Sequence, residues 1–166
     1  MTASYPFVPK TNARLRPGDF WSIPLVDGSY ACGRVLQMPT TRFPSSTVQF
    51  LGALMDWHGS AEPDATSLAG AGTLDRGVMH VISITRIGEC VAGNRDLALD
   101  GIEPGLFING TDIQRGYDYV REFRLGDRGQ IPEWSWWSWN LIWHFANRRL
   151  LGRELPDDAE PADYRR

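Results

Sequence analysis

The sequence predicts an α+β protein in which a mainly antiparallel β-sheet is followed by one C-terminal helix. Short apolar runs separated by turn residues occupy the chain as far as residue 125, which is typical of antiparallel strands. The pair Asp27-Gly28 lies between two apolar runs and is a strong hairpin signal, because type I′ turns need positive φ at both central residues. Beyond residue 130 the apolar spacing changes to a helical period.

Turn-forming residues predict the strands in the first third of the chain. Pro17 presets the φ angle of a tight turn and Gly18 adds conformational freedom, so this pair leads into the first strand. The Asp27-Gly28 turn then returns the chain along a second strand. A third strand precedes a long loop over 59–77, and loops of this length are often functional or mobile. The three strands are expected over 20–25, 30–38 and 47–57.

Alternation predicts the second half of the sheet. Residues 78–87 alternate between two faces and form the most regular strand pattern in the chain. Shorter strands are expected around 90–92 and 107–108, and a longer one over 117–125. Together these strands predict a curved or SH3-like, partly closed sheet.

The C-terminal helix is expected to begin at Pro132 and Glu133. Proline suits the first turn of a helix, and a carboxylate suits the positive end of the helix dipole. Arg148 and Arg149 suit the last turn, and Gly152 suits the position that ends the helix. A strand through 134–136 before the helix is an open alternative.

Length and composition indicate one globular domain. A chain of 166 residues is within the usual range for a single domain, and 42% hydrophobic with 22% charged residues excludes wholesale disorder. Residues 1–15 are expected to form an irregular arm and 16–153 the domain. Residues 154–166 are charged and poor in apolar side chains, so we expect a disordered tail.

Net charge and cysteine content limit which partners and which cellular compartment we expect. Lys and Arg number 17 and Asp and Glu 20, so the net charge is −3, which argues against a general nucleic-acid or anionic-membrane binder. Cys32 and Cys90 are too few for a disulfide framework, which indicates a reducing compartment. The most apolar stretch, 134–146, is shorter than the roughly 20 residues of a membrane span. We therefore expect a cytoplasmic protein with no membrane partner.

No set of residues predicts a catalytic or metal site. His58, His80 and His144 lie in three separate expected elements and lack metal-ligand spacing. Cys32 has no neighbouring base or helix N-terminus that would lower the pKa of its thiol. The sequence contains no phosphate-binding glycine pattern. We expect no catalytic residue, no metal and no cofactor, and therefore no enzyme activity.

Tryptophan is the unusual component, because five of the seven tryptophans lie within 134–143. So many indoles in a short segment cannot all face inward on one helical stripe. We expect a stripe of Trp136, Trp139 and Trp143 to face the core, with Trp134 or Trp137 at least partly exposed. Exposed aromatic residues are common anchors of protein interfaces. The predicted partner contacts are Asp56, Trp57 and His58 at the end of the third strand, together with Trp134 and Trp137.

Two segments carry motifs that are similar to a known family. The first combines the Gly18-Asp19 turn, the strand that ends in Ile23-Pro24-Leu25, and the return strand through Gly33-Arg34-Val35-Leu36. The second comprises Gly88, Val91, Gly93-Asn94-Arg95, Leu97 and Asp100-Gly101-Ile102-Glu103-Pro104. Both resemble the immunity protein 26 family of bacterial polymorphic toxin systems. The resemblance covers roughly residues 14–108 and does not extend to the tryptophan-rich segment.

This resemblance implies a compact α+β protein without catalytic activity that binds and neutralises a cognate toxin protein in the cytoplasm. It implies no nucleic-acid partner, and we expect a monomer or a weak homodimer. A second resemblance leaves an alternative open. Arg-Pro-Gly-Asp followed by an aromatic residue is also similar to the start of SH3-like-barrel endoribonuclease toxins, which would make the protein a ribonuclease or an RNA-binding module. In that group a proline follows the arginine of the return strand, whereas Arg34 is followed by Val35.

Overall fold

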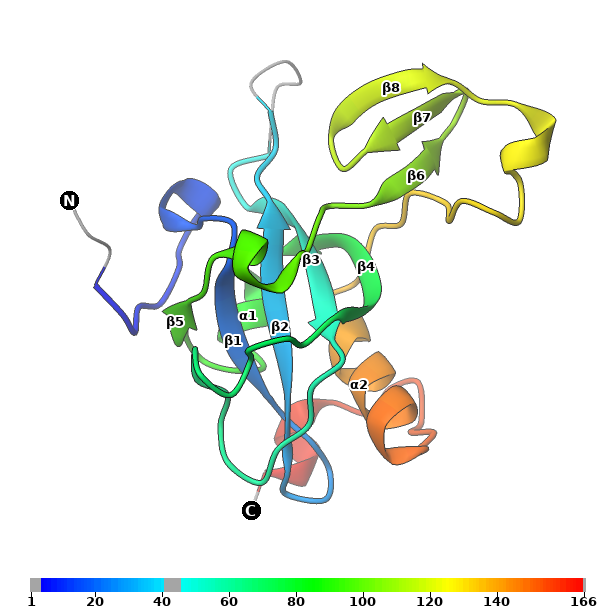
Figure 1. Cartoon of the computed structure of the whole chain (residues 1–166). Coiled ribbons are helices and arrows are strands. Elements are labelled where there is room, and N and C mark those ends of the chain that lie inside the picture. Colours follow the sequence, from blue (N-terminus) through cyan, green and yellow to red (C-terminus); the bar gives the residue numbers. More distant parts are fainter. Residues whose placement is uncertain (1–3, 41–45, 166) are drawn as a thin grey trace.

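Five strands form the main sheet of the computed structural model, which describes residues 4–40 and 46–165 (Figure 1). All neighbouring strands are antiparallel, and their order across the sheet is β4-β3-β2-β1-β5. The first two strands form a hairpin at Asp27-Gly28, as predicted, but only Gly28 has a positive φ (86°), so the predicted type I′ turn is wrong. The strands are β1 (Asp19–Pro24), β2 (Tyr30–Gln37), β3 (Gln49–Met55), β4 (Thr73–His80) and β5 (Gly93–Asn94).

Three further strands form a second antiparallel sheet that projects away from the main sheet (Figure 1). These are β6 (Leu106–Asn109), β7 (Asp112–Arg115) and β8 (Asp118–Glu122). The main helix is α2 (Leu141–Leu151). The fold class is therefore α+β with antiparallel sheets and one main C-terminal helix, as predicted, and both sheets are open. The shorter helices are α1 (Ile82–Thr85) and the 3-10 turns η1 (Asn12–Arg14), η2 (Leu97–Asp100), η3 (Leu125–Asp127) and η4 (Pro161–Tyr164).

Both faces of the main sheet are buried, because successive strand residues point to opposite faces. In β3, Phe50 and Leu54 belong to the core on the face that α2 covers. Leu51, Ala53 and Met55 belong to a second core on the other face, beneath the loop that follows β3. This double burial explains why the strands are apolar almost throughout.

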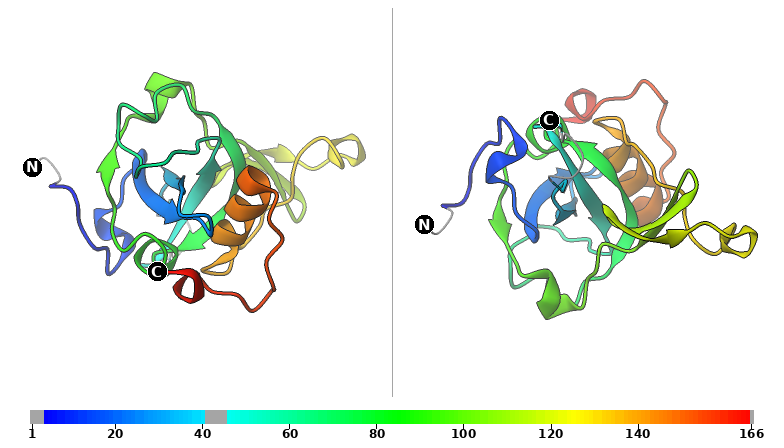
Figure 2. Two further views of the ribbon diagram at one scale, coloured as in Figure 1. Left: turned by 90° about the horizontal axis from the view of Figure 1, so that it is seen from below. Right: turned by 90° about the horizontal axis from the view of Figure 1, so that it is seen from above.

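Helix α2 packs against the first face of the main sheet (Figure 2). Trp143 is 1% exposed, and its indole N–H donates to the carbonyl of Pro24 at 2.9 Å. The side-chain carbonyl of Asn147 accepts the N–H of Val26 at 3.1 Å. Gly152 ends the helix with a φ of 64°, as predicted from its position. The helix therefore also anchors the β1–β2 hairpin.

The helix begins at Leu141, so the prediction that it begins at Pro132 is wrong. Residues 132–137 are called the bridging segment. They are extended because their backbone N–H and C=O groups form hydrogen bonds with strands of both sheets. Ile108 donates to the carbonyl of Pro132 at 2.8 Å, and Trp134 donates to that of Ile108 at 2.7 Å. Val78 donates to the carbonyl of Ser135, and Trp137 donates to that of Val78, each at 2.8 Å. The bridging segment thus joins β6 to β4, and the extended alternative for 134–136 is the correct one.

Two predicted strands have different bounds in the structure. The regular pattern over 78–87 contains the end of β4 and then α1. The Nδ1 atom of His80 accepts the N–H of Ile82 at 3.1 Å, which turns the chain out of the sheet. Strand β4 itself begins at Thr73, inside the region predicted as a long loop. The pattern also does not predict β7, because four residues are too few to show alternation.

Both ends of the described chain contact the rest of the molecule. In the arm, Phe7 is 6% exposed and exchanges two backbone hydrogen bonds with Val91, at 3.1 and 2.8 Å. In the C-terminal segment, for which the sequence predicts disorder, Ala159 and Pro161 are buried. The carbonyl of Ala159 lies 3.1 Å from Nε2 of His144. None of the helices in the described ranges has the length and apolar character needed to cross a bilayer.

Candidate functional site

The first motif contains Asp19, whose side chain is fully buried and accepts three hydrogen bonds. Its Oδ1 atom accepts the Tyr5 hydroxyl at 2.5 Å and the Asn94 side-chain amide at 2.9 Å. Its Oδ2 atom accepts the N–H of Arg16 at 2.9 Å. Burial, together with the hydrogen bond to Asp19, raises the pKa of Tyr5 to about 12. Asp19 therefore ties the N-terminal arm and β5 to the start of β1.

Arg34 and Asp100 form a buried ion pair on the second face of the main sheet. Neither side chain has exposed surface, and Arg34 Nη1 lies 2.9 Å from Asp100 Oδ2. The same carboxylate accepts Nε of Arg95 and the N–H of Gly70, each at 2.9 Å. The hydrogen bonds from Arg95, Gly70 and Arg34 hold the pKa of Asp100 well below its ordinary value. This network fastens the loops that follow β3 and β5 to β2.

These contacts bring the two motif segments together in space. The Asp19–Asn94 and Arg34–Asp100 contacts each join one motif segment to the other. Gly18, with a φ of 92°, approaches the second segment so closely that a Cβ atom would lie 2.4 Å from the carbonyl oxygen of Arg95. Only glycine fits such an approach. These motif residues therefore stabilise the fold by joining the two segments.

Asp56, Trp57 and His58 lie at the end of β3, beside the β1–β2 hairpin. Tyr30 and Gly59 exchange backbone hydrogen bonds at 2.8 and 3.0 Å, which places this segment against the hairpin turn. Asp56 and His58 are exposed, and Trp57 is half-buried. Accordingly, these three predicted contact residues form one continuous part of the surface.

His58, Ser29 and Asp27 form a chain of hydrogen bonds at the hairpin turn. The Nε2 atom of His58 lies 2.7 Å from Oγ of Ser29, and the Ser29 hydroxyl donates to Oδ1 of Asp27. The hydrogen bonds from Ser29 lower the pKa of Asp27. The chain thus fixes His58 to the hairpin turn.

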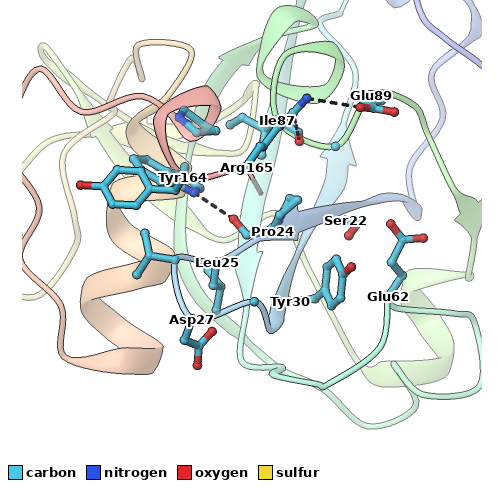
Figure 3. A pocket seen from close by; sticks show the side chains of 15 residues that line it. Ser22, Pro24, Leu25, Asp27, Tyr30, Glu62, Ile87, Glu89, Tyr164 and Arg165 are labelled. Carbon is cyan, nitrogen blue, oxygen red and sulfur yellow. Dashed lines mark hydrogen bonds and ion pairs between the residues drawn. The ribbon is translucent and has the colours of Figure 1, made fainter.

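A cavity of about 620 Å³ lies under the same hairpin (Figure 3). The hairpin forms one wall, and residues 87–89 with the C-terminal segment form another. Three carboxylates line the cavity, from Asp27, Glu62 and Glu89, together with the guanidinium of Arg165. Glu89 has a φ of 70°, the only positive φ of a non-glycine residue in the part of the chain that the structure describes. The cavity therefore brings together five separate regions of the sequence, and its charged side chains are three carboxylates and one guanidinium.

The bridging segment divides its tryptophans between core and surface. Trp137 is 8% exposed and belongs to the core beneath α2. Trp134 is half-buried, and its ring centroid lies 5.1 and 5.2 Å from those of Phe107 and Tyr117. Trp136 is 61% exposed. An extended segment alternates its side chains between opposite sides, which separates Trp136 from Trp137.

The predicted core stripe is therefore wrong for Trp136. Trp143 is buried in the core, and Trp139 is half-buried against it. Trp136 lies before the helix and does not share its period. Of the two predicted contact tryptophans, Trp134 is partly exposed, as expected for one of the pair, and Trp137 is covered by protein.

The described residues were also compared with the requirements of metal binding and of thiol chemistry. Within 4–40 and 46–165, no group of three His, Cys, Asp or Glu side chains is placed to hold a metal ion. Both cysteines are free thiols. Burial raises the pKa of Cys32, and burial together with the charges of Glu62 and Glu89 raises that of Cys90. Neither thiol is activated as a nucleophile.

Sequence reasoning missed the Arg34–Asp100 pair and the cavity. One signal could have identified Arg34, namely an arginine within an otherwise apolar strand, because a buried guanidinium needs a charged partner. The cavity has no such local signal. Its walls come from segments far apart in the sequence, and only the fold brings them together.

The fold and the buried network define a small α+β protein built on two open antiparallel sheets. The immunity protein 26 family model matches residues 16–111, which is more than half of the chain. The chain therefore belongs to the immunity protein 26 family. The matched region contains the whole main sheet and ends before β7, so the bridging segment and α2 lie outside it. Comparisons with curated proteins and with solved structures gave no significant match.

Proposed function

We propose that this protein neutralises a cognate bacterial toxin by binding it, without chemistry of its own, in the cytoplasm of the cell that it protects. The observation that carries the proposal is the family match over residues 16–111. We also propose that the protein acts as a monomer or a weak homodimer.

The proposed contact surface has two parts. The first is the hairpin end with Asp56, Trp57 and His58. The second surrounds Trp134 and Trp136, where Trp136 takes the role expected of Trp137, because only an exposed indole can enter a partner. Exposed apolar side chains of the second sheet and of the turn after it extend this part, namely Tyr119, Val120 and Leu125.

The test of this function is capture followed by rescue. The tagged protein is used to isolate partners from a lysate of its own bacterium, and mass spectrometry identifies them. We expect one near-stoichiometric partner with a domain that is toxic when expressed alone and harmless when co-expressed with this protein. A captured partner that stays toxic on co-expression contradicts the proposal. Cleavage of RNA by the purified chain, with no partner captured, would instead favour the ribonuclease alternative.

Single substitutions test the contact surface once the toxin is identified. Trp136→Ala should weaken the complex by about 2 kcal/mol or more, measured by calorimetry, because buried aromatic anchors dominate interface energies. Asp56→Ala and His58→Ala test the hairpin end in the same way. The control is Val8→Ala, which alters a residue 62% exposed on the N-terminal arm, on the side opposite the second sheet (Figure 2). Unchanged affinity in all variants would reject these contacts and leave the function itself intact.

A further inference from the structure

Arg76 of β4 is a half-buried arginine whose side chain forms no hydrogen bond and no ion pair with any described residue. Three other described arginines are buried or half-buried, and each pairs with an aspartate at 2.7 to 2.9 Å, namely Arg34, Arg95 and Arg121. The residues outside the described ranges include no Asp or Glu. A charge that is partly removed from water needs a partner, so Arg76 is the exception among the described arginines.

The side chain of Arg76 lies at the junction of the two sheets. In β4 it is directly opposite Ala53 of β3, whose side chain belongs to the second core. Opposite residues of an antiparallel pair share a face of the sheet, so Arg76 points to the same face as Ala53. A Cβ atom at Gly105, just before β6, would lie 3.3 Å from Cζ of Arg76. The guanidinium therefore lies against the backbone that leads into the second sheet.

The end of this guanidinium is open to solvent although its base is covered. The Nε atom of Arg76 is buried and has no hydrogen-bond partner. The two Nη atoms also have no partner among the described residues, but they are not buried. Burial lowers the pKa of Arg76, and no carboxylate offsets this effect. A guanidinium that has already lost part of its water attracts a carboxylate more strongly than a fully hydrated one.

Two tryptophans of the bridging segment lie beside Arg76. The segment runs parallel to β4 here, with Trp136 next to Val78. Arg76 and Trp134 each precede this pair by two residues, and Trp134 packs against the second core. Trp136 is 61% exposed. The surface around Arg76 thus combines an unpaired guanidinium with an accessible indole, and these two side chains are enriched among the dominant contacts of protein interfaces.

We propose that the Nη atoms of Arg76 bind a carboxylate of a protein partner, an Asp or Glu side chain whose apolar neighbours cover Trp136. That this partner is the toxin rests on the proposed function, whereas the binding of a carboxylate does not. A single carboxylate suits this site because it can accept both Nη groups of one guanidinium.

A nucleic-acid phosphate suits the same site less well. Glu133 and Asp118 are exposed on the two segments that border Trp134, and the net charge of the chain is −3. A chain of phosphates would meet these carboxylates and needs several basic groups to neutralise it. Arg76 supplies one. The geometry therefore favours one acidic side chain of a folded or extended polypeptide.

The first measurement separates a binding role of Arg76 from a structural one. Arg76→Met removes the charge and keeps an apolar stem, and no partner within the fold is left behind. The midpoint of urea unfolding should therefore stay the same or rise. Arg34→Met is the matched control and should lower the midpoint, because Arg34 has a buried partner in Asp100. A clear decrease for Arg76→Met would mean that its guanidinium is satisfied within the fold, which would overturn the proposal.

The probe for binding is a phage-displayed library of random peptides. Selection on the full chain, with counter-selection on the Arg76→Met variant, should enrich peptides that carry Asp or Glu beside apolar residues. A selected peptide should bind Arg76→Met about tenfold more weakly, measured by fluorescence anisotropy, a ratio that corresponds to about 1.4 kcal/mol. The same peptide with its acidic residue replaced by the matching amide should bind the wild type and Arg76→Met equally.

Arg153→Met is the control for net charge, because Arg153 is exposed beyond α2. It should leave the affinity for the selected peptide unchanged. Selection without acidic residues, equal affinity of the wild type and Arg76→Met, or an equal loss in Arg153→Met would overturn the proposal. So would Arg76-dependent binding of a single-stranded RNA when no acidic peptide binds, since the ligand would then be a phosphate. No toxin is used, so a failure here is distinct from a failure of toxin rescue.

Discussion

The charge of Arg34 lies in a side chain with no exposed surface, and its counter-charge on Asp100 is equally buried. Removing one member of such a pair leaves the other charge without compensation. We expect Asp100→Asn to lower the free energy of unfolding by about 3 kcal/mol or more, measured by urea unfolding with tryptophan fluorescence. The control is Glu103→Gln, which breaks the exposed pair with Arg115 and should cost less than about 1 kcal/mol.

The double variant Arg34→Met with Asp100→Leu removes both charges together and should recover much of the loss. Replacing a whole buried pair by apolar groups is often neutral, in contrast to breaking it. If the double variant is less stable than Asp100→Asn, then the network supplies more than charge compensation. In that case its hydrogen bonds to Gly70 and to the backbone of Arg95 are the main stabilising contacts.

The pH dependence of stability follows from two lowered carboxyl pKa values. Hydrogen bonds from Arg95, Gly70 and Arg34 lower the pKa of Asp100, and those from Arg121 and the N–H of Arg124 lower that of Asp127 to about 2 from 3.8. A carboxyl with a lowered folded pKa stabilises the protein above its unfolded value and loses this contribution as the pH falls. The free energy of unfolding should therefore decrease between about pH 4 and pH 2.

Urea unfolding at a series of pH values measures this effect. Asp127→Asn should flatten the curve within that interval, because asparagine does not titrate. Above pH 5 its curve should run parallel to that of the wild type, since the Asp127 carboxylate is then charged in both the folded and the unfolded state. A wild-type curve that stays level down to pH 2 would contradict the lowered pKa values.

At the scale of elements, the bridging segment places one tryptophan in the core and its neighbour on the surface. Trp137→Ala should lower the free energy of unfolding by about 3–5 kcal/mol, because the ring fills the core beneath α2. Its backbone neighbour gives the matched control, because Trp136 is 61% exposed and Trp136→Ala should cost less than about 1 kcal/mol. The comparison is made by chemical unfolding. Equal losses for the two variants would place Trp136 in the core, as a helical stripe requires.

This segment also shows why the sequence predicts some elements and not others. The place of the hairpin and the end of α2 were predicted correctly, because Gly28 and Gly152 each supply a positive φ locally, whereas the type of the hairpin turn was not. The start of α2 was predicted wrongly. Proline and glutamate at 132–133 suit the first turn of a helix, but hydrogen bonds to the edges of two sheets hold this segment extended. Pairing between distant segments has no local signature. For the same reason the cavity could not be predicted from the sequence. Asp56, Trp57 and His58 could be grouped because they are neighbours in the sequence.

At the scale of the whole molecule, the two sheets differ in how they are protected. Strands β2 and β3 are covered on both faces, whereas every residue of β8 is at least partly exposed. The sheets are joined by four backbone hydrogen bonds of the bridging segment and by the side chain of Gln37, which donates to Asp118 at 3.1 Å and accepts the N–H of Tyr117 at 2.9 Å. Phe107 of β6 belongs to the second core of the main sheet, whereas β7 and β8 project from it (Figure 1). The outer strands β7 and β8 can therefore open with little effect on the main core.

Hydrogen exchange measures this difference directly. We expect the paired amides of β7 and β8 to exchange through local opening, well before those of β2 and β3, which should exchange only on global unfolding. Trp137→Ala loosens the attachment of the bridging segment and should speed exchange in β6 to β8 beyond the effect of lower global stability. Trp136→Ala is again the control. Equal protection of both sheets would mean that they unfold as one unit.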